Sequence, residues 1–328
     1  MKYYYYTLAL SAFFLFSSCK KEQVLKNYTL KGAVFGTTYK ITYLEADSNY
    51  QKSIDSLFVK MNSSLSTYIT TSDISRINKG ETNVIVDDYF IEVFNKSKRI
   101  FTETDGFFDP TVGNLVNAWG FGPKDEKKNL SDEDVKNQMQ FVGLNKVKLE
   151  GNKITKESPE IYLDFNSIAK GFGIDVVGRF LESKKINNYL VEIGGEIRTS
   201  GFKENNQPWL VKLVDPLNSN TGFKTLNLSN KSMATSGNYR KFRVSDSGNK
   251  YVHTVNPKTG YALESNLLSA SVLANLDCAD VDAYATAFMA MGLERTKAFL
   301  ENHSNIKVVL LYINKKGVIE EYSNYTYK

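Results

Sequence analysis

Asp282 and Thr286 stand four residues apart in the segment DCADVDAYATAFMAMG. On a helix this spacing places the carboxylate and the hydroxyl on one face, with the carbonyl of Ala285 nearby if the helix is irregular there. Such oxygens are hard ligands suited to Mg²⁺ or Ca²⁺. A structural alternative exists, in which Asp277 or Asp280 caps the helix and Asp282 only favours its positive end.

The segment LDFNSIAKGFGID has residues that could bind an anion. We expect Asp164 at the end of a strand, a turn through Asn166 and Ser167, and Lys170 in the first turns of a helix. A helix N-terminus offers free N–H groups, and the lysine adds a full positive charge. The pattern matches neither GxxxxGK[ST] nor GxGxxG. An ordinary capped helix, with Asp164 as a turn acceptor, explains it equally well.

Aromatic residues and one histidine are further candidates. The segment FFDPTVGNLVNAWGFGP places Asp109 in a predicted loop with rings and glycines, which suits stacking against a planar ligand or a packed surface loop. Tyr68, expected at the end of a helix, could flank a ring or close the core. His253 lies in the turn-rich segment YVHTVNPKTG, and His303 lies in a polar stretch. His253 is therefore the better candidate for acid–base chemistry.

Length and composition indicate an ordered globular protein. The 328 residues are 42% hydrophobic and can bury a large core, as one large domain or two in close contact. The 41 basic and 36 acidic residues give a net charge of +5 without a basic block, so we expect no nucleic-acid partner. The abundance of Tyr and Phe argues against a disordered adaptor.

The first residues, MKYYYYTLALSAFFLFSSC, form a predicted targeting segment. One positive charge, a short apolar run and small residues before Cys19 resemble a bacterial lipoprotein signal peptide over residues 1–18. We expect Cys19 to be lipidated and residues 19–27 to be a tether, with the protein anchored in the cell envelope and facing the periplasm or another extracytoplasmic space. An ordinary signal peptide is the alternative. Cys278 is then unpaired, and we expect a small core residue.

Hydrophobic periodicity predicts a mixture of helices and strands without strict βαβ alternation. Helices are expected at residues 50–68, 87–106, 167–185 and 277–292, with a short one capped by Ser131. Strands are expected at residues 28–46 (broken at Gly36), 146–150, 160–165, 188–201, 208–216, 224–237, 240–246, 251–257 and 307–323. The mixture indicates an α+β fold, in a single domain over residues 28–328.

Eight segments together resemble the ApbE-type flavin transferases, also called FAD:protein FMN transferases. In order they are FGTTYKITY, LSTY, FDPTVGNLVNAWGFGP, LDFNSIAKGFGID, LVEIGGEIRTSG, ATSGNYRKF, VHTVNPKTG and DAYATAFMAMG. The resemblance implies a T-fold-related domain of antiparallel sheet and helices. It also implies FAD as the substrate, bound with Mg²⁺ (Ca²⁺ is the alternative ion). The FMN moiety would pass to a Thr or Ser hydroxyl of an acceptor flavoprotein subunit, with release of AMP.

The same resemblance assigns roles to residues. Asp282, Thr286 and the carbonyl of Ser167 are implied metal ligands with Ala285 beside them. We expect Asp282 and His253 to be the catalytic residues, with His253 or a nearby carboxylate as the base. Implied FAD contacts are Phe35, Tyr68, Phe107, Phe108, Asp109, Asp164, Lys170 and Val255. Asp277 and Asp280 are then expected to cap the helix or face solvent.

Three positions depart from the usual family pattern. Phe35 stands where Met is typical, Asn256 replaces an Asp, and Ser167 stands where Gly, Ala or Thr is common. Two other functions remain open at this point. One is an Mg²⁺-dependent FAD pyrophosphatase, in which water replaces the acceptor hydroxyl, and the other is a non-enzymatic flavin-binding lipoprotein.

Overall fold

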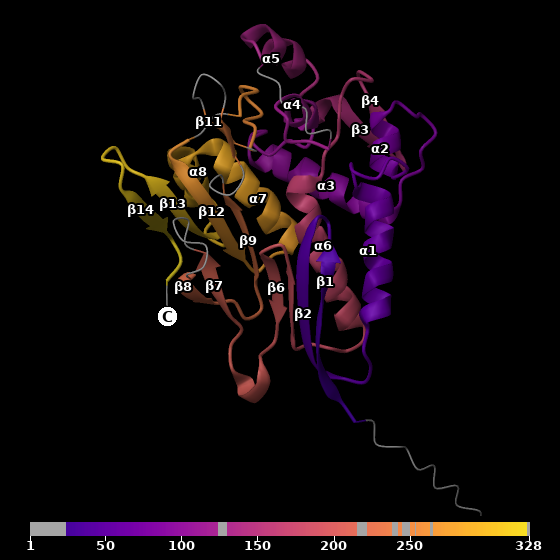
Figure 1. Ribbon diagram of the computed structural model, residues 1–328, viewed down its shortest axis with the longest axis vertical. Helices are drawn as coiled ribbons and strands as arrows, with labels where there is room; N and C mark the ends of the chain where they lie inside the picture. Colours follow the sequence, from indigo (N-terminus) through magenta and orange to yellow (C-terminus); the bar gives the residue numbers. More distant parts are fainter. Residues whose placement is uncertain are drawn as a thin grey trace, which may run out of the picture.

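The structure is a computed structural model that describes residues 24–123, 130–214, 222–237, 242–244, 250–252, 254–262 and 265–326 (Figure 1). Within these residues, its centre is an eight-stranded sheet in the order β1-β2-β5-β6-β9-β12-β13-β14, antiparallel at every pairing. The strands are β1 (Lys26–Val34), β2 (Thr37–Ala46), β5 (Tyr189–Ile193), β6 (Glu196–Ser200), β9 (Ser232–Gly237), β12 (Leu267–Ala274), β13 (Lys307–Ile313) and β14 (Ile319–Ser323).

Helices cover one face of this sheet. Two of them, α6 (Asn166–Ser183) and α7 (Cys278–Met291), pack side by side directly against the central strands. Outside them lie α1 (Gln51–Leu65) and α3 (Asp88–Glu103), and α8 (Leu293–Glu301) follows α7 (Figure 1). The main hydrophobic core lies between the helices and the sheet, and both α6 and α7 are buried along most of their length.

Short elements complete the molecule on either side of the core. A hairpin of β7 (Leu210–Val214) and β8 (Gly222–Asn227) forms a second small core with the sheet face that the helices leave uncovered. A third core surrounds Trp119. The remaining elements are α2 (Asp73–Asn78), α4 (Gly113–Ala118), α5 (Asp132–Met139), β3 (Val147–Glu150), β4 (Lys153–Lys156), β10 (Phe242–Val244), β11 (Lys250–Val252), and two 3₁₀ turns, Leu144–Lys146 and Glu204–Asn206.

The α+β prediction is confirmed, and several local signals act as expected. Phe35 and Gly36 form the turn between β1 and β2, both at positive φ (51° and 73°), which explains the break in that strand signal. Ser131 caps α5 in a reciprocal capping box with Asp134. The helices α1, α3 and α7 lie within the predicted ranges, and α6 begins one residue earlier than predicted, at Asn166.

The strand predicted at residues 160–165 is wrong. The segment is extended, but its pairing is a single parallel bridge between Tyr162 and Val112. The side chain of Asn78 bonds both the N–H and the carbonyl of Leu163, each at 2.8 Å. Hydrogen bonds to the side chain of Asn78 thus take the place of hydrogen bonds to a neighbouring strand along this segment. The segment still delivers Asp164 to the start of α6, as the sequence indicates.

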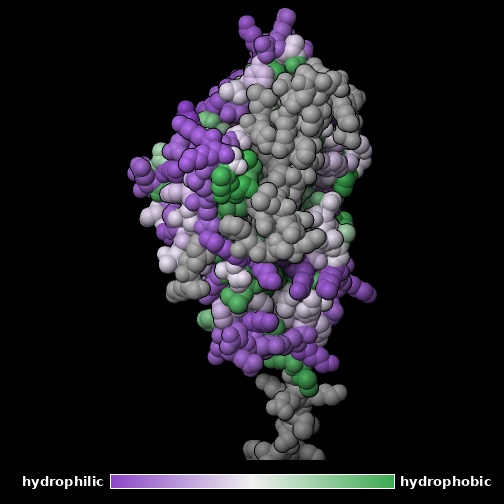
Figure 2. All heavy atoms as spheres, turned by 60° about the vertical axis from the view of Figure 1, so that its left-hand side comes forward, coloured by the Kyte–Doolittle hydropathy of each residue, from purple (hydrophilic) through white to green (hydrophobic). Residues whose placement is uncertain are grey.

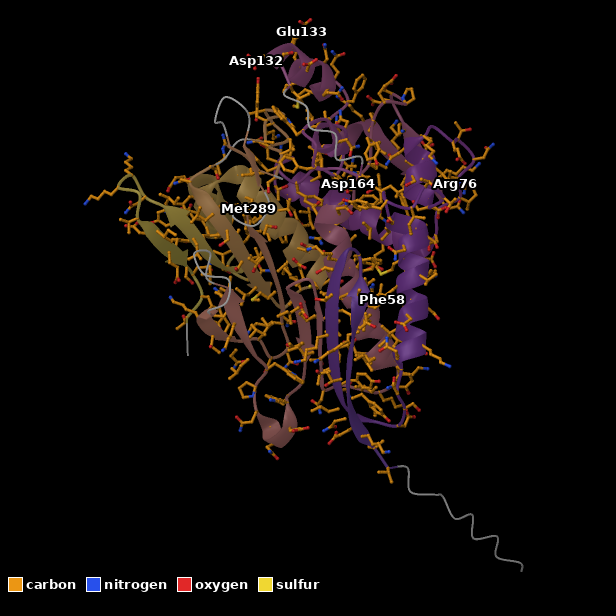
Figure 3. The ribbon with its side chains drawn as sticks, viewed as in Figure 1. Phe58, Arg76, Asp132, Glu133, Asp164 and Met289 are labelled. Carbon is orange, nitrogen blue, oxygen red and sulfur yellow. The ribbon has the colours of Figure 1, made fainter. Side chains whose placement is uncertain are left out.

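The start of β1 and the pocket-lining residue Asp164 lie in different halves of the molecule. β1 begins at the lower end in Figure 1, and Asp164 lies in the upper half in Figure 3.

The face in Figure 2 is mostly hydrophilic, with small and separate hydrophobic spots among the described residues. Across the part of the chain that the structure describes, no helix has the length and apolar character to cross a bilayer.

Candidate active site

A pocket of about 1100 Å³ opens between the α6–α7 pair, the β5–β6 turn and the loops that carry Phe107 and Val255. This volume suits a dinucleotide-sized ligand. Predicted site residues gather in its lining: Phe35, Tyr68, Phe107, Phe108, Asp109, Asp164, Ser167, Lys170, Val255, Asp282 and Thr286. Ala285 is fully buried beside them on α7 and does not line the pocket.

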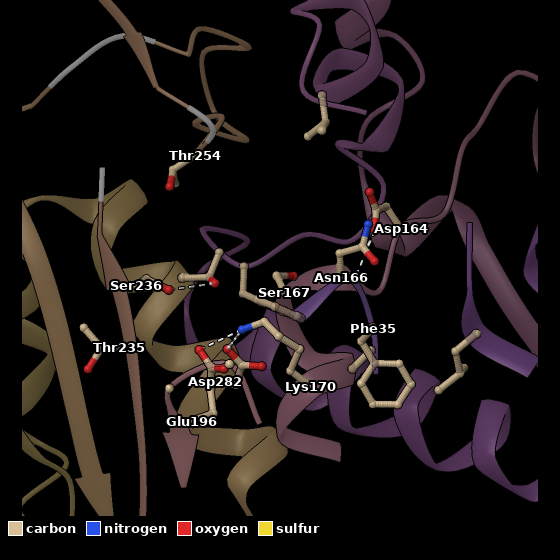
Figure 4. Close-up of a pocket in the computed structure, with 18 of the residues that line it drawn as sticks. Phe35, Asp164, Asn166, Ser167, Lys170, Glu196, Thr235, Ser236, Thr254 and Asp282 are labelled. Carbon is tan, nitrogen blue, oxygen red and sulfur yellow. Dashed lines mark hydrogen bonds and ion pairs between the residues drawn. The ribbon is translucent and has the colours of Figure 1, made fainter. Parts of the chain in front are cut away.

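The polar floor of the pocket is formed by side chains of α6, α7 and β6 (Figure 4). The Lys170 ammonium lies 2.7 Å from Oε1 of Glu196 and 3.9 Å from Oδ1 of Asp282. Oδ2 of Asp282 accepts a hydrogen bond from the Gly171 N–H at 3.1 Å. The Asp282 side chain is only 4% exposed, so the lysine and the amide are its compensation for burial in the described structure.

The pKa values of these groups follow from burial and charge. Burial and the nearby Glu196 raise the pKa of Asp282, Lys170 and the Gly171 amide lower it, and the net result is a pKa of about 7. The two nearby carboxylates hold the pKa of Lys170 above its usual range despite the cost of burying the ammonium. Lys170 is therefore a permanent positive charge on the floor.

Thr286 lies one helical turn after Asp282, and both line the pocket, as the spacing predicts. Its hydroxyl is 3.3 Å from the hydroxyl of Ser236 on β9. Ser167 lies in the first turn of α6 and also lines the pocket. A carboxylate, a hydroxyl and the first turn of α6 thus converge on the same space.

Two other carboxylates, on the wall of the pocket, accept hydrogen bonds from neighbouring groups of the protein. Oδ1 of Asp109 accepts hydrogen bonds from the N–H and hydroxyl of Thr111 at 2.8 and 2.6 Å. Oδ1 of Asp164 accepts from the Asn166 N–H at 2.8 Å, so it does act as a turn acceptor at the start of α6. Burial raises the pKa of both Asp109 and Asp164. Oδ2 of Asp109 also accepts from the Leu144 N–H at 3.3 Å, so both oxygens of Asp109 take part in holding the loop.

Aromatic side chains form the less polar wall. Phe107 and Phe108 are buried, and Phe107 is bordered by Arg295 and Lys258, whose charged groups lie 5.3 and 5.6 Å from its ring centroid. Tyr68 lies beyond the end of α1 and is 59% exposed. It therefore does not close the core but stands at the mouth, where a planar group could stack on it.

Glu196 was not predicted as a site residue. Its side chain is 5% exposed, one oxygen pairs with Lys170, and the other is buried without a hydrogen-bond partner among the described residues. It follows Gly194 and Gly195, which turn β5 into β6 at φ of 65° and 106°. A glutamate directly after a glycine pair at a hairpin is the signal that could have drawn attention to it, because such a turn brings the side chain to a sheet end.

The start of α7 differs from the prediction. Asp277 is the N-cap residue, but its side chain makes no cap hydrogen bond. Asp280 is buried and forms ion pairs with Lys96 at 3.2 Å and Arg99 at 2.7 Å. The expectation is wrong for Asp280, because α3 packs its cations over this turn. Asp277 does occupy the N-cap position and is partly exposed, but its side chain pairs with Lys96 and does not cap the helix.

The side-chain amide of Asn256 donates a hydrogen bond that an aspartate carboxylate could not donate. Its amide Nδ2 donates to the carbonyl of Ala290 near the end of α7 at 3.2 Å, and its Oδ1 accepts from the Lys258 N–H at 2.8 Å. The amide thus ties the loop of Val255 to α7, without a charged role. His253 in the same loop, and Cys19 at the predicted lipidation site, lie outside the described residues. Cys278 is a fully buried core residue.

The lining of the pocket is acidic overall. Among its described residues five are acidic and two are basic: Asp109, Asp164, Glu192, Glu196 and Asp282 against Lys170 and Lys212. In the described part of the chain, no group of three or more His, Cys, Asp or Glu side chains could hold a metal ion. The predicted ligand set contains one carboxylate, with a hydroxyl and carbonyls, so it is not a cluster of that kind.

Buried charges on the floor and rings on the wall define an α+β protein that binds a ligand both aromatic and charged. The model of the ApbE family matches residues 35–310, so the chain belongs to the ApbE family. A relative from Vibrio cholerae named FAD:protein FMN transferase is 35% identical over 98% of this chain and 97% of its own length.

Solved structures agree with this assignment. The flavin transferase ApbE from Vibrio cholerae superposes with a TM-score of 0.81 at 34% identity, over 92% of this chain and 97% of that one. The apo form of the Pseudomonas stutzeri flavinyl transferase ApbE gives 0.82 at 28% identity, over 91% and 95%.

Proposed function

We propose that this protein transfers the FMN moiety of FAD to a Thr or Ser hydroxyl of an acceptor protein and releases AMP. The observation that carries the proposal is the pocket. It combines an aromatic wall with a floor of Lys170, Asp282 and Thr286, in a chain whose relatives over nearly full length are named for this reaction. The two alternatives, hydrolysis and storage of FAD, are outcomes of the test below.

The acidic lining supports a bound divalent cation. A pyrophosphate is an anion, and a pocket with more carboxylates than lysines would repel it unless a cation lies between them. Asp282, Thr286 and the carbonyl of Ser167 would hold Mg²⁺, which usually takes one or two carboxylates and completes its shell with water and phosphate oxygens. Ca²⁺ uses the same kinds of oxygen but prefers more protein ligands. Bound there, the ion would neutralise charge on the phosphoryl oxygens.

Lys170 and the aromatic residues of the pocket would bind and orient FAD. Lys170 places a fixed charge beside the phosphates, and Glu196 holds its ammonium in place. Phe107, Phe108 and Tyr68 would contact planar rings.

The reaction exchanges one phosphorus–oxygen bond for another. The acceptor oxygen forms a bond to the FMN-side phosphorus, the bond to the AMP oxygen breaks, and the hydroxyl proton leaves to a base. We assign that base to His253, or to a carboxylate near it. A well-placed base would contribute roughly 10²–10⁴-fold to the rate.

The experiment combines FAD, Mg²⁺ and a candidate acceptor protein, and measures both the mass of the acceptor and the AMP released. We expect the acceptor to gain the mass of one FMN less one water, and one AMP to be released for each acceptor modified. For Asp282→Asn we expect at least about 100-fold less product, since even outer partners of metal ligands cost 10–100-fold when removed. The matched control is Asp55→Asn on the exposed side of α1, which should retain full activity.

Three other results would contradict parts of the proposal. AMP and FMN released at full rate without acceptor would make the protein a pyrophosphatase. Bound FAD without any AMP release would make it a storage protein. Unchanged turnover by Asp282→Asn would remove the metal assignment.

We further propose that Cys19 carries the lipid anchor and that the domain works on the extracytoplasmic side of the envelope. The support is the targeting pattern of residues 1–19, in which small serines directly precede the cysteine.

A further inference from the structure

A group of charged side chains lies beneath the first turn of α7, outside the pocket lining. We call Lys96, Asp175, Arg198, Asp277 and Asp280 the α7 base cluster. They come from α3, α6, β6 and α7, and ion pairs at 2.7–3.2 Å connect them. The proposed reaction uses none of these residues, so their role has to be sought in what they hold.

Asp175 caps a helix to which it does not belong. Its Oδ1 accepts from the Cys278 N–H and its Oδ2 from the Ala279 N–H, each at 2.8 Å. These amides open α7, whose own N-cap side chain makes no cap bond. A carboxylate of α6 therefore occupies the place of an N-cap side chain, where free N–H groups and the helix dipole favour negative charge.

Asp175 is ionised at neutral pH. Burial and the charge of Asp277 raise its pKa, Arg198 and the two amides lower it, and the net result is a pKa of about 6. Every hydrogen-bond partner that Asp175 has in the described structure is a donor. The carboxylate thus keeps both oxygens available to α7 at the pH at which the protein would work.

Arg198 connects this cap to the pocket floor. Its guanidinium lies 2.7 Å from Oδ1 of Asp175 and 3.1 Å from Oδ1 of Asp277. On β6 it stands two residues after Glu196, and such residues point to the same face of a strand. The strand that presents Glu196 to Lys170 therefore also presents Arg198 to the start of α7.

The two central helices exchange carboxylate–amide hydrogen bonds. α6 offers Asp175 to the amides of Cys278 and Ala279, and α7 offers Asp282 to the amide of Gly171. The partners are four residues apart on α6 and three to four apart on α7, so the two contacts lie one turn apart on both helices. Together they determine how far α7 is shifted along α6.

We propose that Asp175 and Arg198 are positioning residues for the metal-binding face of α7, that is, for Asp282 and Thr286. The proposal rests on the Mg²⁺ site of the proposed function. A purely stabilising role would not require ions here, because a buried ion pair replaced by apolar groups often leaves stability unchanged. What apolar groups could not supply is the bond to two specific amides.

The test measures Mg²⁺-dependent binding of FAD by the full chain, from the change in flavin fluorescence during a Mg²⁺ titration. The double variant Asp175→Asn with Arg198→Gln removes both charges and leaves neither one buried alone. We expect its apparent Mg²⁺ affinity to fall by up to about 10-fold, the lower limit for removing a direct partner of a metal ligand, because Asp175 acts on the ligands only through the backbone of α7. FAD binding in EDTA should stay within about 2-fold of wild type, because neither residue lines the pocket.

Two controls separate positioning from stability. Arg179→Gln with Glu92→Gln removes an ion pair of 2.8 Å between α6 and α3 that has no bond to α7, and its Mg²⁺ affinity should equal wild type. Val308→Ala should lower the melting temperature, because it removes buried apolar atoms on β13, a strand that carries none of the cluster residues. All titrations are run well below each melting temperature.

Each result has a defined meaning. Wild-type Mg²⁺ affinity in the double variant would overturn the positioning role, as would an equal loss in Val308→Ala. If the double variant does not fold, Asp175→Asn alone decides in the same way, since it retains one acceptor oxygen and should show a smaller loss. A wild-type protein whose FAD binding ignores Mg²⁺ would instead refute the metal site, and the positioning role with it.

Discussion

Asp282 is the residue whose surroundings most strongly affect its ionisation in the pocket. It is almost fully buried and Glu196 lies nearby, and Lys170 at 3.9 Å and the Gly171 amide offset these effects only in part. A divalent cation bound to its oxygens would stabilise the carboxylate form and release the proton that the buried group holds at lower pH.

A pH-dependent stability follows from that residue. In the metal-free fold its pKa is raised from the ordinary value of 3.8 to about 7, so the folded state holds a proton that the unfolded state has lost. Stability is therefore highest below about pH 4 for this group and declines as pH rises through 7, by on the order of 3 kcal/mol. Urea unfolding in EDTA at pH 5 and pH 8 measures the decline.

Asp282→Asn supplies the comparison for this prediction, because an amide does not titrate. Its stability should fall less between pH 5 and pH 8 than that of wild type, and adding Mg²⁺ should stabilise only wild type. Equal slopes for the two proteins would mean that Asp282 is already ionised at pH 5 in the fold.

At the scale of elements, α6 and α7 approach so closely that a side chain at Gly171 has no room. A Cβ there would lie 2.3 Å from the carbonyl oxygen of Cys278 and 2.7 Å from the nitrogen of Ala279, both backbone atoms. The glycine is thus required by the packing of the helix pair.

Gly171→Ala should move α7 away from α6. We expect a loss of about 1–3 kcal/mol in unfolding free energy, as for other overpacked sites, together with weaker Mg²⁺-dependent FAD binding. Gly32→Ala on β1 is the control, because its Cβ would meet the side chain of Tyr39, which can shift and does not line the pocket. Equal losses in the two variants would show that α7 tolerates displacement.

Elements also mark where prediction from sequence succeeds. The apolar stripe on α3, with Phe90, Val93 and Phe94 buried, is a local pattern that one helix can express alone. The pairing of Asp282 with Thr286 on α7 was predictable for the same reason. The cap of α7 was not, because Asp175 lies about a hundred residues before the amides that it binds.

Long-range partners explain the remaining errors as well. From the sequence, Asp280 is expected to face solvent. In the fold, Lys96 and Arg99 of α3 lie beside it and form ion pairs with it. Residues 160–165 have the composition of a strand, but the side chain of Asn78 takes the hydrogen bonds that a neighbouring strand would have made. In both cases the deciding group is far away in the sequence.

For the whole molecule, the predicted lipid anchor is open to a direct test. Cys19→Ala should yield a protein that does not label with a fatty acid and that stays in the aqueous phase after detergent partition, whereas wild type partitions with lipid. Transfer activity on a soluble acceptor should be equal, because the pocket lies within the described domain. Labelling of Cys19→Ala to the wild-type extent would refute the anchor at this residue.

The chain enters the sheet through β1 at the lower end of the molecule, and the pocket is lined by Asp164 in the upper half (Figures 1 and 3). If Cys19 is anchored in a bilayer as proposed, and the domain stands with its N-terminal end toward the lipid, the pocket would be held away from the membrane surface. An acceptor whose hydroxyl lies flush with the membrane surface would be out of reach, whereas one that carries it on a projecting domain or loop would meet the pocket mouth. The position of the N-terminus would then favour acceptors whose hydroxyl projects away from the membrane.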